Sequence, residues 1–446
     1  MCAKNIIYYL IAVVTVFSYA CVDHKDAGRI PVTGITLDTE EVVLAVGCNI
    51  TLNAAIEPED ATFKTVIWNT SDPNVVAVDS SRHNRLSVAL KPLMKGNATI
   101  TVSSEDGNKT AKCEITVAEG MSMTTTENTG EMKFYIAGSG KFSIFWDEGK
   151  IETKELSECN SSDWNSLQSK YEYKHVYSGT AERSVTIAGG NITHLICSRL
   201  KLNSLVVSDN TALTLLDCSD NQFLTTLDVS NNKKLTQLYC NYNKITELNV
   251  NNNLALTILD CRNNELTGLD VGNNTLLKEL RLSDGNQVGS LTVNTNTELT
   301  ILDCRDNKIA ALDVTKNTAL TILDCRENNI TILDVTKNTA LTQLSCSSNK
   351  LTALNISQNT ELVDVYCRDN QLTSLDLSKN GKLIILDCSN NSFNAAALNA
   401  LIGTLHSNIS DITKNIYIQG QTTGDTAGAA AHNDAISKGW TLHVTN

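Results

Sequence analysis

Cysteine residues recur at a nearly fixed interval in the second half of the sequence. Neighbouring cysteines lie 21 or 22 residues apart, and Leu282 occupies the slot between two that lie further apart. The series consists of Cys218, Cys240, Cys261, Cys304, Cys325, Cys346, Cys367 and Cys388. Thiols can bind metals, form disulfides or act in redox chemistry. A tetrahedral metal site needs ligands that converge on one point, whereas a fixed interval predicts thiols in a line.

Buried free thiols explain the cysteine series better than disulfides do. Bonds between neighbouring repeats are sterically possible, because adjacent strands lie within the Cα distance that a disulfide accepts. However, Leu282 replaces one Cys, and the matching position in the second half of the repeat holds valines. These valines are Val229, Val250, Val271 and Val335. The position therefore needs a small apolar residue, and a free Cys behaves as one.

The surrounding sequence repeats with the same period, which predicts a solenoid. A typical unit runs from Leu320 to Asn338, with leucine or isoleucine at regular positions and asparagine at two of them. This unit resembles the leucine-rich repeat, in the nested 21-residue subclass common in bacterial surface proteins. The resemblance implies parallel strands that stack coil on coil, with the leucines inside.

Two asparagine columns accompany the leucines. Asparagine tolerates the left-handed backbone conformation, and its amide can satisfy the backbone of a turn. We therefore expect both columns to be buried and structural. The first contains Asn221, Asn243, Asn264, Asn307, Asn328, Asn349, Asn370 and Asn391, and the second contains Asn210, Asn232, Asn253, Asn274, Asn296, Asn317, Asn338, Asn359 and Asn380.

The sequence before the repeats predicts a separate N-terminal domain. A chain of 446 residues exceeds one small core, and all four prolines lie in the first hundred residues. Residues 29–118 alternate apolar and polar side chains in short runs between turns, which predicts an all-β sandwich. The segments 32–37, 67–71 and 96–102 resemble the bacterial group 2 Ig-like domain, with Trp68 as the core aromatic residue. The resemblance implies a spacer.

Residues 1–20 have the pattern of a secretory signal peptide, in which Lys4 precedes an apolar run at residues 6–17 that is short for a membrane span. The end of this segment resembles a bacterial lipobox, which implies cleavage before Cys21 and a lipid on its thiol. The alternative is an ordinary signal peptide cut after Ala20. Residues 21–28 would form a lipidated tether and the only membrane attachment. We expect a lipid-anchored protein of the outer membrane, on the surface of a Gram-negative cell.

The remaining segments complete the predicted domain organisation. Residues 119–190 are β-rich and resemble a PKD-like sandwich; we interpret them as the N-terminal cap of the solenoid, because the end of a solenoid exposes apolar edges. Residues 191–394 form the solenoid, and residues 395–446 a small α/β C-terminal cap. The fold class is thus mainly β, with an Ig-like sandwich followed by a leucine-rich-repeat solenoid.

Residues that face outward beside the cysteines are the candidate binding residues. Side chains alternate along a strand, so the residue before each Cys and the two after it should lie on an open face. Neighbouring Asp and Arg would neutralise each other there, which favours a solvated face and argues against Ca²⁺. The alternative is a binding surface, since Tyr and Arg dominate interface hot spots. The candidates are Tyr239, Tyr242, Arg262, Arg281, Arg305, Arg326, Tyr366 and Arg368. We expect Tyr239, Tyr242 and Arg281 to come from successive coils and to lie close together.

Nothing in the sequence points to catalysis. The seven histidines are scattered, and no phosphate-binding, dinucleotide-binding or zinc-protease motif is present. The sequence therefore predicts no catalytic residue, metal or cofactor. A net charge of -13 argues against nucleic acid as a partner.

Three functions are compatible with this pattern. The first is a non-enzymatic, surface-displayed binding protein resembling adhesins and internalins, whose open face binds a protein or glycan, including one of host origin. The second is a structural scaffold of the cell envelope with no foreign ligand. The third is a glycan-degrading enzyme, but such an enzyme needs paired carboxylates in a cleft, and the Asp column would lie on a flat face.

Overall fold

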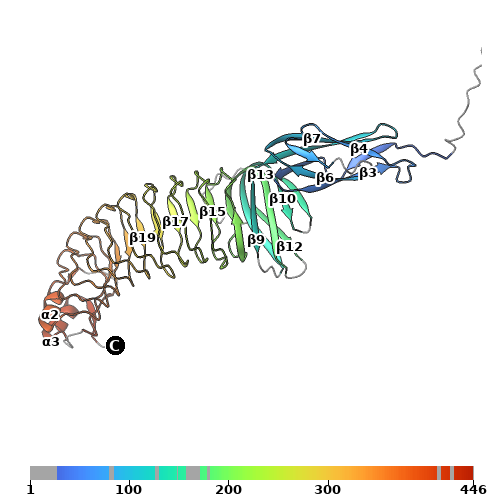
Figure 1. The fold of residues 1–446 in the computed structure, drawn as a ribbon. Coiled ribbons are helices and arrows are strands. Elements are labelled where there is room, and N and C mark those ends of the chain that lie inside the picture. Colours follow the sequence, from blue (N-terminus) through green and yellow to red (C-terminus); the bar gives the residue numbers. More distant parts are fainter. Residues whose placement is uncertain are drawn as a thin grey trace, which may run out of the picture.

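The domains follow one another along an elongated, curved molecule (Figure 1). The computed structural model describes residues 28–79, 85–125, 130–147, 149–156, 171–177, 181–408, 413–421 and 426–444. The expected signal peptide, Cys21 and nearly all of the tether lie outside the described residues. No helix in the described part of the chain is long and apolar enough to cross a membrane.

Two four-stranded sheets form the N-terminal sandwich, in the orders β1-β3-β6-β5 and β2-β8-β7-β4. Alternation makes one face of each strand apolar, as in β3, where every second residue is buried. Trp68 is buried as predicted, and its indole N–H donates to the carbonyl of Arg85 at 2.9 Å. The strands are β1 Gly34–Leu37, β2 Glu41–Ala45, β3 Ile50–Glu57, β4 Val66–Thr70, β5 Val76–Val78, β6 Ser87–Pro92, β7 Gly96–Ser104 and β8 Thr110–Ala118.

The cap is continuous with the solenoid. Strand β13 pairs antiparallel with β10 and parallel with β15, the first strand of the repeats. One buried cluster accordingly extends from Met121 in the cap to Trp440 near the C-terminus. The resemblance to a PKD-like sandwich stays a prediction. The cap strands are β9 Gly120–Thr125, β10 Glu131–Trp146, β11 Ile151–Leu156, β12 Glu172–Val176 and β13 Arg183–Ile196, followed by β14 Leu202–Val206.

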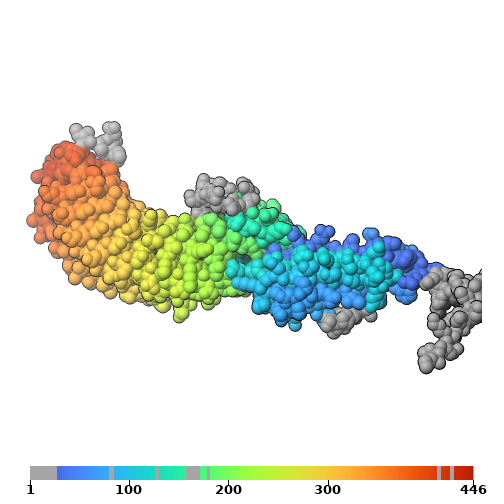
Figure 2. All heavy atoms as spheres, turned by 90° about the horizontal axis from the view of Figure 1, so that it is seen from above, coloured from blue at the N-terminus to red at the C-terminus, as the bar shows by residue number. Residues whose placement is uncertain are grey.

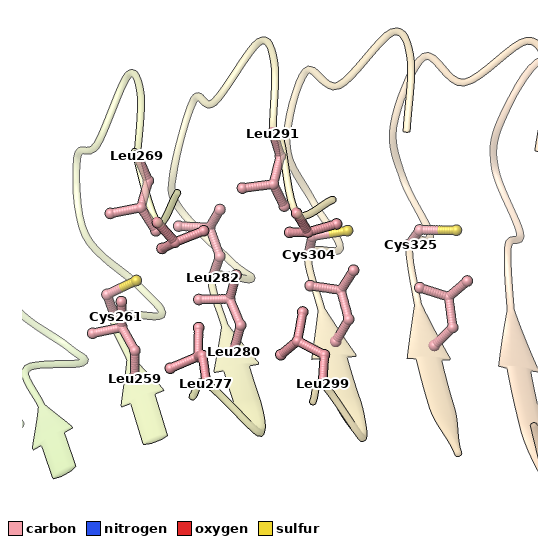
Figure 3. Packing of buried hydrophobic residues seen from close by; sticks show 14 of the residues in the cluster. Leu259, Cys261, Leu269, Leu277, Leu280, Leu282, Leu291, Leu299, Cys304 and Cys325 are labelled. Carbon is pink, nitrogen blue, oxygen red and sulfur yellow. The ribbon is translucent and has the colours of Figure 1, made fainter. Parts of the chain in front are cut away.

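Each repeat contributes a three-residue parallel strand in which the central residue is buried. The Cys slot follows directly, and successive coils stack Leu on Leu and Cys on Cys, with Leu282 between Cys261 and Cys304 (Figure 3). These thiols are free and buried, as predicted. The strands are β15 Leu215–Asp217, β16 Gln237–Tyr239, β17 Ile258–Asp260, β18 Glu279–Arg281, β19 Ile301–Asp303, β20 Ile322–Asp324, β21 Gln343–Ser345, β22 Asp364–Tyr366 and β23 Ile385–Asp387.

The asparagine columns join the coils by hydrogen bonds, as the sequence predicts. The amide of Asn328 donates to the carbonyls of Cys304 (3.0 Å) and Cys325 (3.2 Å), and its oxygen accepts from the Ile309 N–H at 2.9 Å. In the second column, Asn338 donates to the carbonyls of the preceding coil. The Leu282 coil also has its asparagine, Asn286, displaced by one inserted residue.

The C-terminal segment extends the sheet rather than merely covering it. Strands β24 Lys414–Tyr417 and β25 Trp440–His443 pair in parallel with β23 and with each other. Helix α2 Ala395–Gly403 lies between β23 and β24 in the sequence, and helix α3 Ala429–Ser437 lies between β24 and β25. The two helices contact each other. Asn394 caps α2 by accepting from the Ala397 N–H. This small α/β segment buries Leu398 and Trp440 in the common core, as a terminal cap must.

The thiol column leads to a first prediction. Cys325 is fully buried, so Cys325→Ser would bury a hydroxyl without an assured partner and should lower the free energy of unfolding by roughly 1–3 kcal/mol. Cys325→Val should be much milder, because valine occupies the matching column. Chemical denaturation measures both. Equal losses from the two changes, or rapid maleimide labelling of the native ladder, would contradict the packing role.

Candidate functional site

The outward side chains of β15–β25 form one continuous surface, called here the open face. Figure 2 shows the solenoid beneath it as a bent rod that continues into the N-terminal domain. The strands pair in register, so equivalent residues of successive coils form columns. The column before the Cys slot reads Asp217, Tyr239, Asp260, Arg281, Asp303, Asp324, Ser345, Tyr366 and Asp387, and continues with Tyr417 and His443.

The register corrects one expectation about the candidate residues. Tyr239 pairs with Asp260, which in turn pairs with Arg281, so a whole coil separates Tyr239 from Arg281. The three candidates Tyr239, Tyr242 and Arg281 therefore do not come from successive coils. Tyr239 and Tyr242 share one coil, and Arg262 of the next coil lies near Tyr242. These residues form the proximal patch: Tyr239, Tyr242, Arg262 and Arg281.

Every candidate arginine on the open face forms an ion pair. Arg262 and Arg326 each bind the Asp two residues earlier with two nitrogens, at 2.6 and 2.7 Å for the closer contacts. Arg281 binds Glu279 at 2.9 Å. Arg305 reaches Asp284 of the preceding coil, and Arg368 binds the adjacent Asp369. The predicted neutralisation of each Asp by the Arg two residues later holds for Arg262 and Arg326. It is wrong for Arg305, which pairs with Asp284 and leaves Asp303 without an ion pair.

Acidic side chains outnumber these arginines on the open face, so its described residues carry a net negative charge. Among the described residues, Asp217, Asp303, Asp364 and Asp387 of the strands have no ion-pair partner. Burial raises the pKa of Asp303, and Asp324 in the next coil raises it further. Burial likewise raises the pKa of Asp217 and of Asp364. The face therefore crowds partly desolvated carboxylates without a matching number of cations.

The backbone conformation of the turn after each Cys slot explains the residue types found at one of its positions. The second residue after the slot has φ between 50° and 57° in each coil. This left-handed conformation suits Asn and Asp, which are the residues in most coils. The exceptions are Tyr242, Glu327 and Ser348. Tyr242 is bulky and 45% exposed, so neither the backbone nor the core accounts for it.

Sequence reasoning missed three columns of the open face. Isoleucines at the first strand position lie half-buried on this face, at Ile258, Ile301, Ile322 and Ile385. Threonines just before the strands donate to the preceding coil, as Thr321 does to the Thr300 carbonyl at 3.0 Å. The third omission is the extension by Tyr417 and His443, whose rings stack at 4.2 Å. The period could have revealed the first two, but not the third, because the terminal coils are degenerate.

A second side of the coils carries a column of Asp and Asn, called here the lateral flank, which only Thr292 interrupts between Asp228 and Asp376. Each of these side chains accepts a hydrogen bond from the backbone two residues later, as Asp313 does from Thr315 at 2.9 Å. A shallow groove of about 920 Å³ lies along its first coils. The column contains Asp228, Asn249, Asp270, Asp313, Asp334, Asn355 and Asp376. These local bonds give the column a structural role.

The described residues contain no group of three or more His, Cys, Asp or Glu side chains that could hold a metal ion. Burial raises the pKa of the Cys325 thiol well above its ordinary value, which disfavours the thiolate that metals and oxidants require. The described histidines lie apart in several elements; burial lowers the pKa of His194. His24 and His83 lie outside the described residues.

Comparison with known proteins identifies the class of the N-terminal domain. Residues 31–115 match the bacterial Ig-like domain (group 2), and the following coils form a leucine-rich-repeat solenoid. The fold is thus an Ig-like domain followed by a leucine-rich-repeat solenoid.

Particular relatives resemble only part of the chain. An Ig-like virion protein of Serratia phage KSP90 is 36% identical over 92 residues, covering 21% of this chain and 34% of that protein. A 3-O-alpha-D-galactosyl-alpha-L-arabinofuranosidase of Bifidobacterium longum subsp. longum is 33% identical over 107 residues, covering 22% of this chain and 9% of the enzyme. The chain therefore spans about a third or less of these relatives.

Among solved structures, the functional domain of InlJ from Listeria monocytogenes, which includes a cysteine ladder, is 33% identical with a TM-score of 0.43. The similarity covers 52% of this chain and 59% of that one. An internalin (inlF) from Listeria monocytogenes is 20% identical with a TM-score of 0.44, covering 58% and 85%.

The surplus carboxylates predict how stability depends on pH. Asp303 has a folded-state pKa above its ordinary 3.8, so its ionisation destabilises the fold. The stability that it contributes is complete below the unfolded-state pKa and is lost as pH rises through the raised value. Asp303→Asn keeps an acceptor for the Ser283 hydroxyl, which donates at 2.9 Å, without the charge. Its unfolding midpoint should match that of the parent at about pH 3 and exceed it at about pH 7.

Asp313→Asn on the lateral flank provides a control of opposite sign. Hydrogen bonds from the side chain and backbone of Thr315 lower the pKa of Asp313, so its ionised form stabilises the fold. That stability is present above the unfolded pKa and lost in acid, so this variant should be less stable than the parent at neutral pH. Thermal unfolding from about pH 3 to pH 7 tests both predictions. If the two variants changed the unfolding midpoint in the same direction at neutral pH, the predicted contrast between the open face and the lateral flank would be wrong.

Proposed function

We propose that this chain is a non-enzymatic binding protein that holds a protein or glycan ligand on the open face of its solenoid. The proximal patch supports this proposal. It joins two tyrosines and two arginines, the residue types that dominate interface hot spots. All four lie outside the leucine, cysteine and asparagine columns that the coil needs for packing.

Tyr242 is the single observation that carries the proposal. Its φ of 55° is costly for a bulky residue, and such strain tends to persist at functional sites. The same position in most other coils holds Asn or Asp, which tolerate this conformation, and Tyr242 is the one aromatic residue among these positions. A ligand that contacts the exposed ring would account for an aromatic residue at a position where Asn would be more stable.

The competing functions have weaker support. An envelope scaffold would need no exposed aromatic residue at a strained position. A glycosidase would need two carboxylates facing each other across a bound sugar, whereas the described Asp columns lie along one side of a sheet. The match to the arabinofuranosidase covers 9% of that enzyme, so its activity gives no support for catalysis here.

We also propose that the protein is anchored to the outer membrane of a Gram-negative cell by a lipid on Cys21, with the solenoid displayed at the surface. The support is the sequence alone: an apolar run followed by a lipobox-like end at Cys21. The Ig-like domain would then act as a spacer between the anchor and the open face.

A stability gain combined with a binding loss tests the role of Tyr242. Tyr242→Asn should raise the free energy of unfolding by about 1 kcal/mol, because Asn tolerates the left-handed backbone. It should also weaken capture of each ligand found on glycan arrays or matrix proteins at least tenfold, as expected for a hot-spot residue. Ser348→Asn, at the equivalent position with φ 54°, should affect stability in the same direction and leave binding unchanged. Parental affinity in the Tyr242 variant would move the site elsewhere on the face.

Replacement of Cys21 tests the anchor. Cys21→Ala removes the thiol that the lipid would modify, so the variant should leave the membrane fraction, while the parent should incorporate labelled fatty acid. Fractionation and metabolic labelling measure these outcomes. A variant that stays in the outer membrane, with no label in the parent, would contradict the proposal.

A further inference from the structure

The end of the open face farthest from the Ig-like domain differs from the proximal patch. Strands β22 to β25 place Tyr366, Asp387, Tyr417 and His443 in one row, each paired with the next. Asp364 lies beside Tyr366, two residues earlier on the same strand. These five residues are called here the distal platform. The row thus places a carboxylate between two phenol rings.

The carboxylates of the distal platform form no ion pair among the described residues. Asp387 accepts hydrogen bonds from the backbone and hydroxyl of Ser389, at 3.1 and 2.6 Å. Arg368, two residues after β22, is held by Asp369 at 2.7 Å; this hydrogen bond is the main cause of its raised pKa, to which the charge of Asp387 adds. Lys414 points inward, where it donates to the carbonyls of Asn408 and Lys438. No described residue therefore lies in ion-pair contact with Asp364 or Asp387.

The aromatic rings complement these carboxylates. Tyr417 and His443 stack with an interplanar angle of 9°, which fixes both rings on the face. Neighbouring strands are roughly 4.8 Å apart, so Tyr366 and Tyr417 stand about 10 Å apart across Asp387. An ammonium group binds a ring within about 6 Å of its centroid, so a cation near Asp387 could contact both rings. A carboxylate between two aromatic residues suits a lysine side chain.

The two other acidic regions of the solenoid lack this combination. In the proximal patch, the carboxylates of Asp260 and Glu279 are already bound by Arg262 and Arg281. On the lateral flank, hydrogen bonds hold each Asp, and Lys316 lies near Asp313. Burial also raises the pKa of Asp364, whose charge a bound cation would stabilise. Asp217 and Asp303 also lack an ion pair, but neither lies between two aromatic residues in its column. The combination of unpaired charge and flanking rings thus singles out the distal platform.

We propose that the distal platform binds a lysine-rich segment of a partner protein, with lysine ammonium groups seated on Asp364 and Asp387 between the tyrosine rings. This assignment rests on the proposed function of the open face as a binding surface, and adds the chemical class of the partner. The half-buried Ile385 beside Asp387 would pack against the methylene stem of a lysine.

An acetylated hexalysine peptide is the probe, measured by titration calorimetry against the mature protein at low and moderate salt. The parent should bind it, with an affinity that falls as salt rises. The double variant Asp364→Asn/Asp387→Asn should bind roughly three- to tenfold more weakly, since each exposed pair contributes modestly. Tyr366→Leu should also weaken binding through loss of the ring. Thermal unfolding confirms that the variants fold.

A matched pair separates specific binding from general attraction to an acidic protein. Asp313→Asn/Asp334→Asn removes the same charge from the lateral flank and should leave hexalysine affinity unchanged. Equal losses in the two double variants, or no binding by the parent at low salt, would overturn the inference. The same variants distinguish this inference from the proposed function. Captured partners that bind the distal variants normally but do not bind Tyr242→Asn would refute the proposed binding of a lysine-rich segment, while the proposal that the open face binds a ligand would stand.

Discussion

The solenoid depends on satisfying the buried backbone of its corners. Each coil has only three residues in a β-strand, and among the described residues helices occur only in the C-terminal segment. Most backbone N–H and C=O groups of a coil therefore lie outside helices and β-ladders. Buried N–H and C=O groups must nevertheless find partners. Asn328 shows how: its amide nitrogen donates to carbonyls of its own and the preceding coil, and its oxygen accepts an N–H of the preceding coil. The leucines contribute the apolar burial, while the asparagines fix how one coil sits on the next.

This division leaves few positions free to vary, and those positions carry the candidate function. Leucine, cysteine and asparagine columns face inward, and the Asp column of the lateral flank bonds to its own turn. Two kinds of position remain free to vary: the strand residues on either side of the buried leucine, and the residues of the turn after the Cys slot. The turn itself prefers Asn or Asp because φ is positive there. Tyr242 departs from that preference, which makes it more informative than an aromatic residue at an unconstrained position.

The periodic features could be predicted from the sequence, and the aperiodic ones could not. Period alone predicts the buried Cys325 and Asn328, because each repeat presents the same environment. It does not predict that Asn286, one residue later than its equivalents, still makes the hydrogen bonds of the column, because that depends on how the inserted residue is accommodated. Nor does it reveal that Arg305 reaches Asp284 of the preceding coil, which depends on rotamers rather than spacing. Of the distal platform, the sequence pointed to Tyr366; Tyr417 and His443 were missed because they belong to degenerate coils that only strand pairing brings onto the face.

The junction with the Ig-like domain gives the open face a fixed direction. Only Glu119 separates β8 from β9, and Val43 donates its N–H to the Ser143 hydroxyl at 3.1 Å. A side chain at Gly120 or Gly189 would overlap the Ig-like domain, so glycine permits this close contact. The edge strand β2 is thereby covered, which removes an exposed strand edge. Because the contact is packed rather than linked by a flexible segment, the two domains should orient as one body. The distal platform then lies at the end of that body farthest from residue 28, where a large partner meets the least steric obstruction (Figure 1).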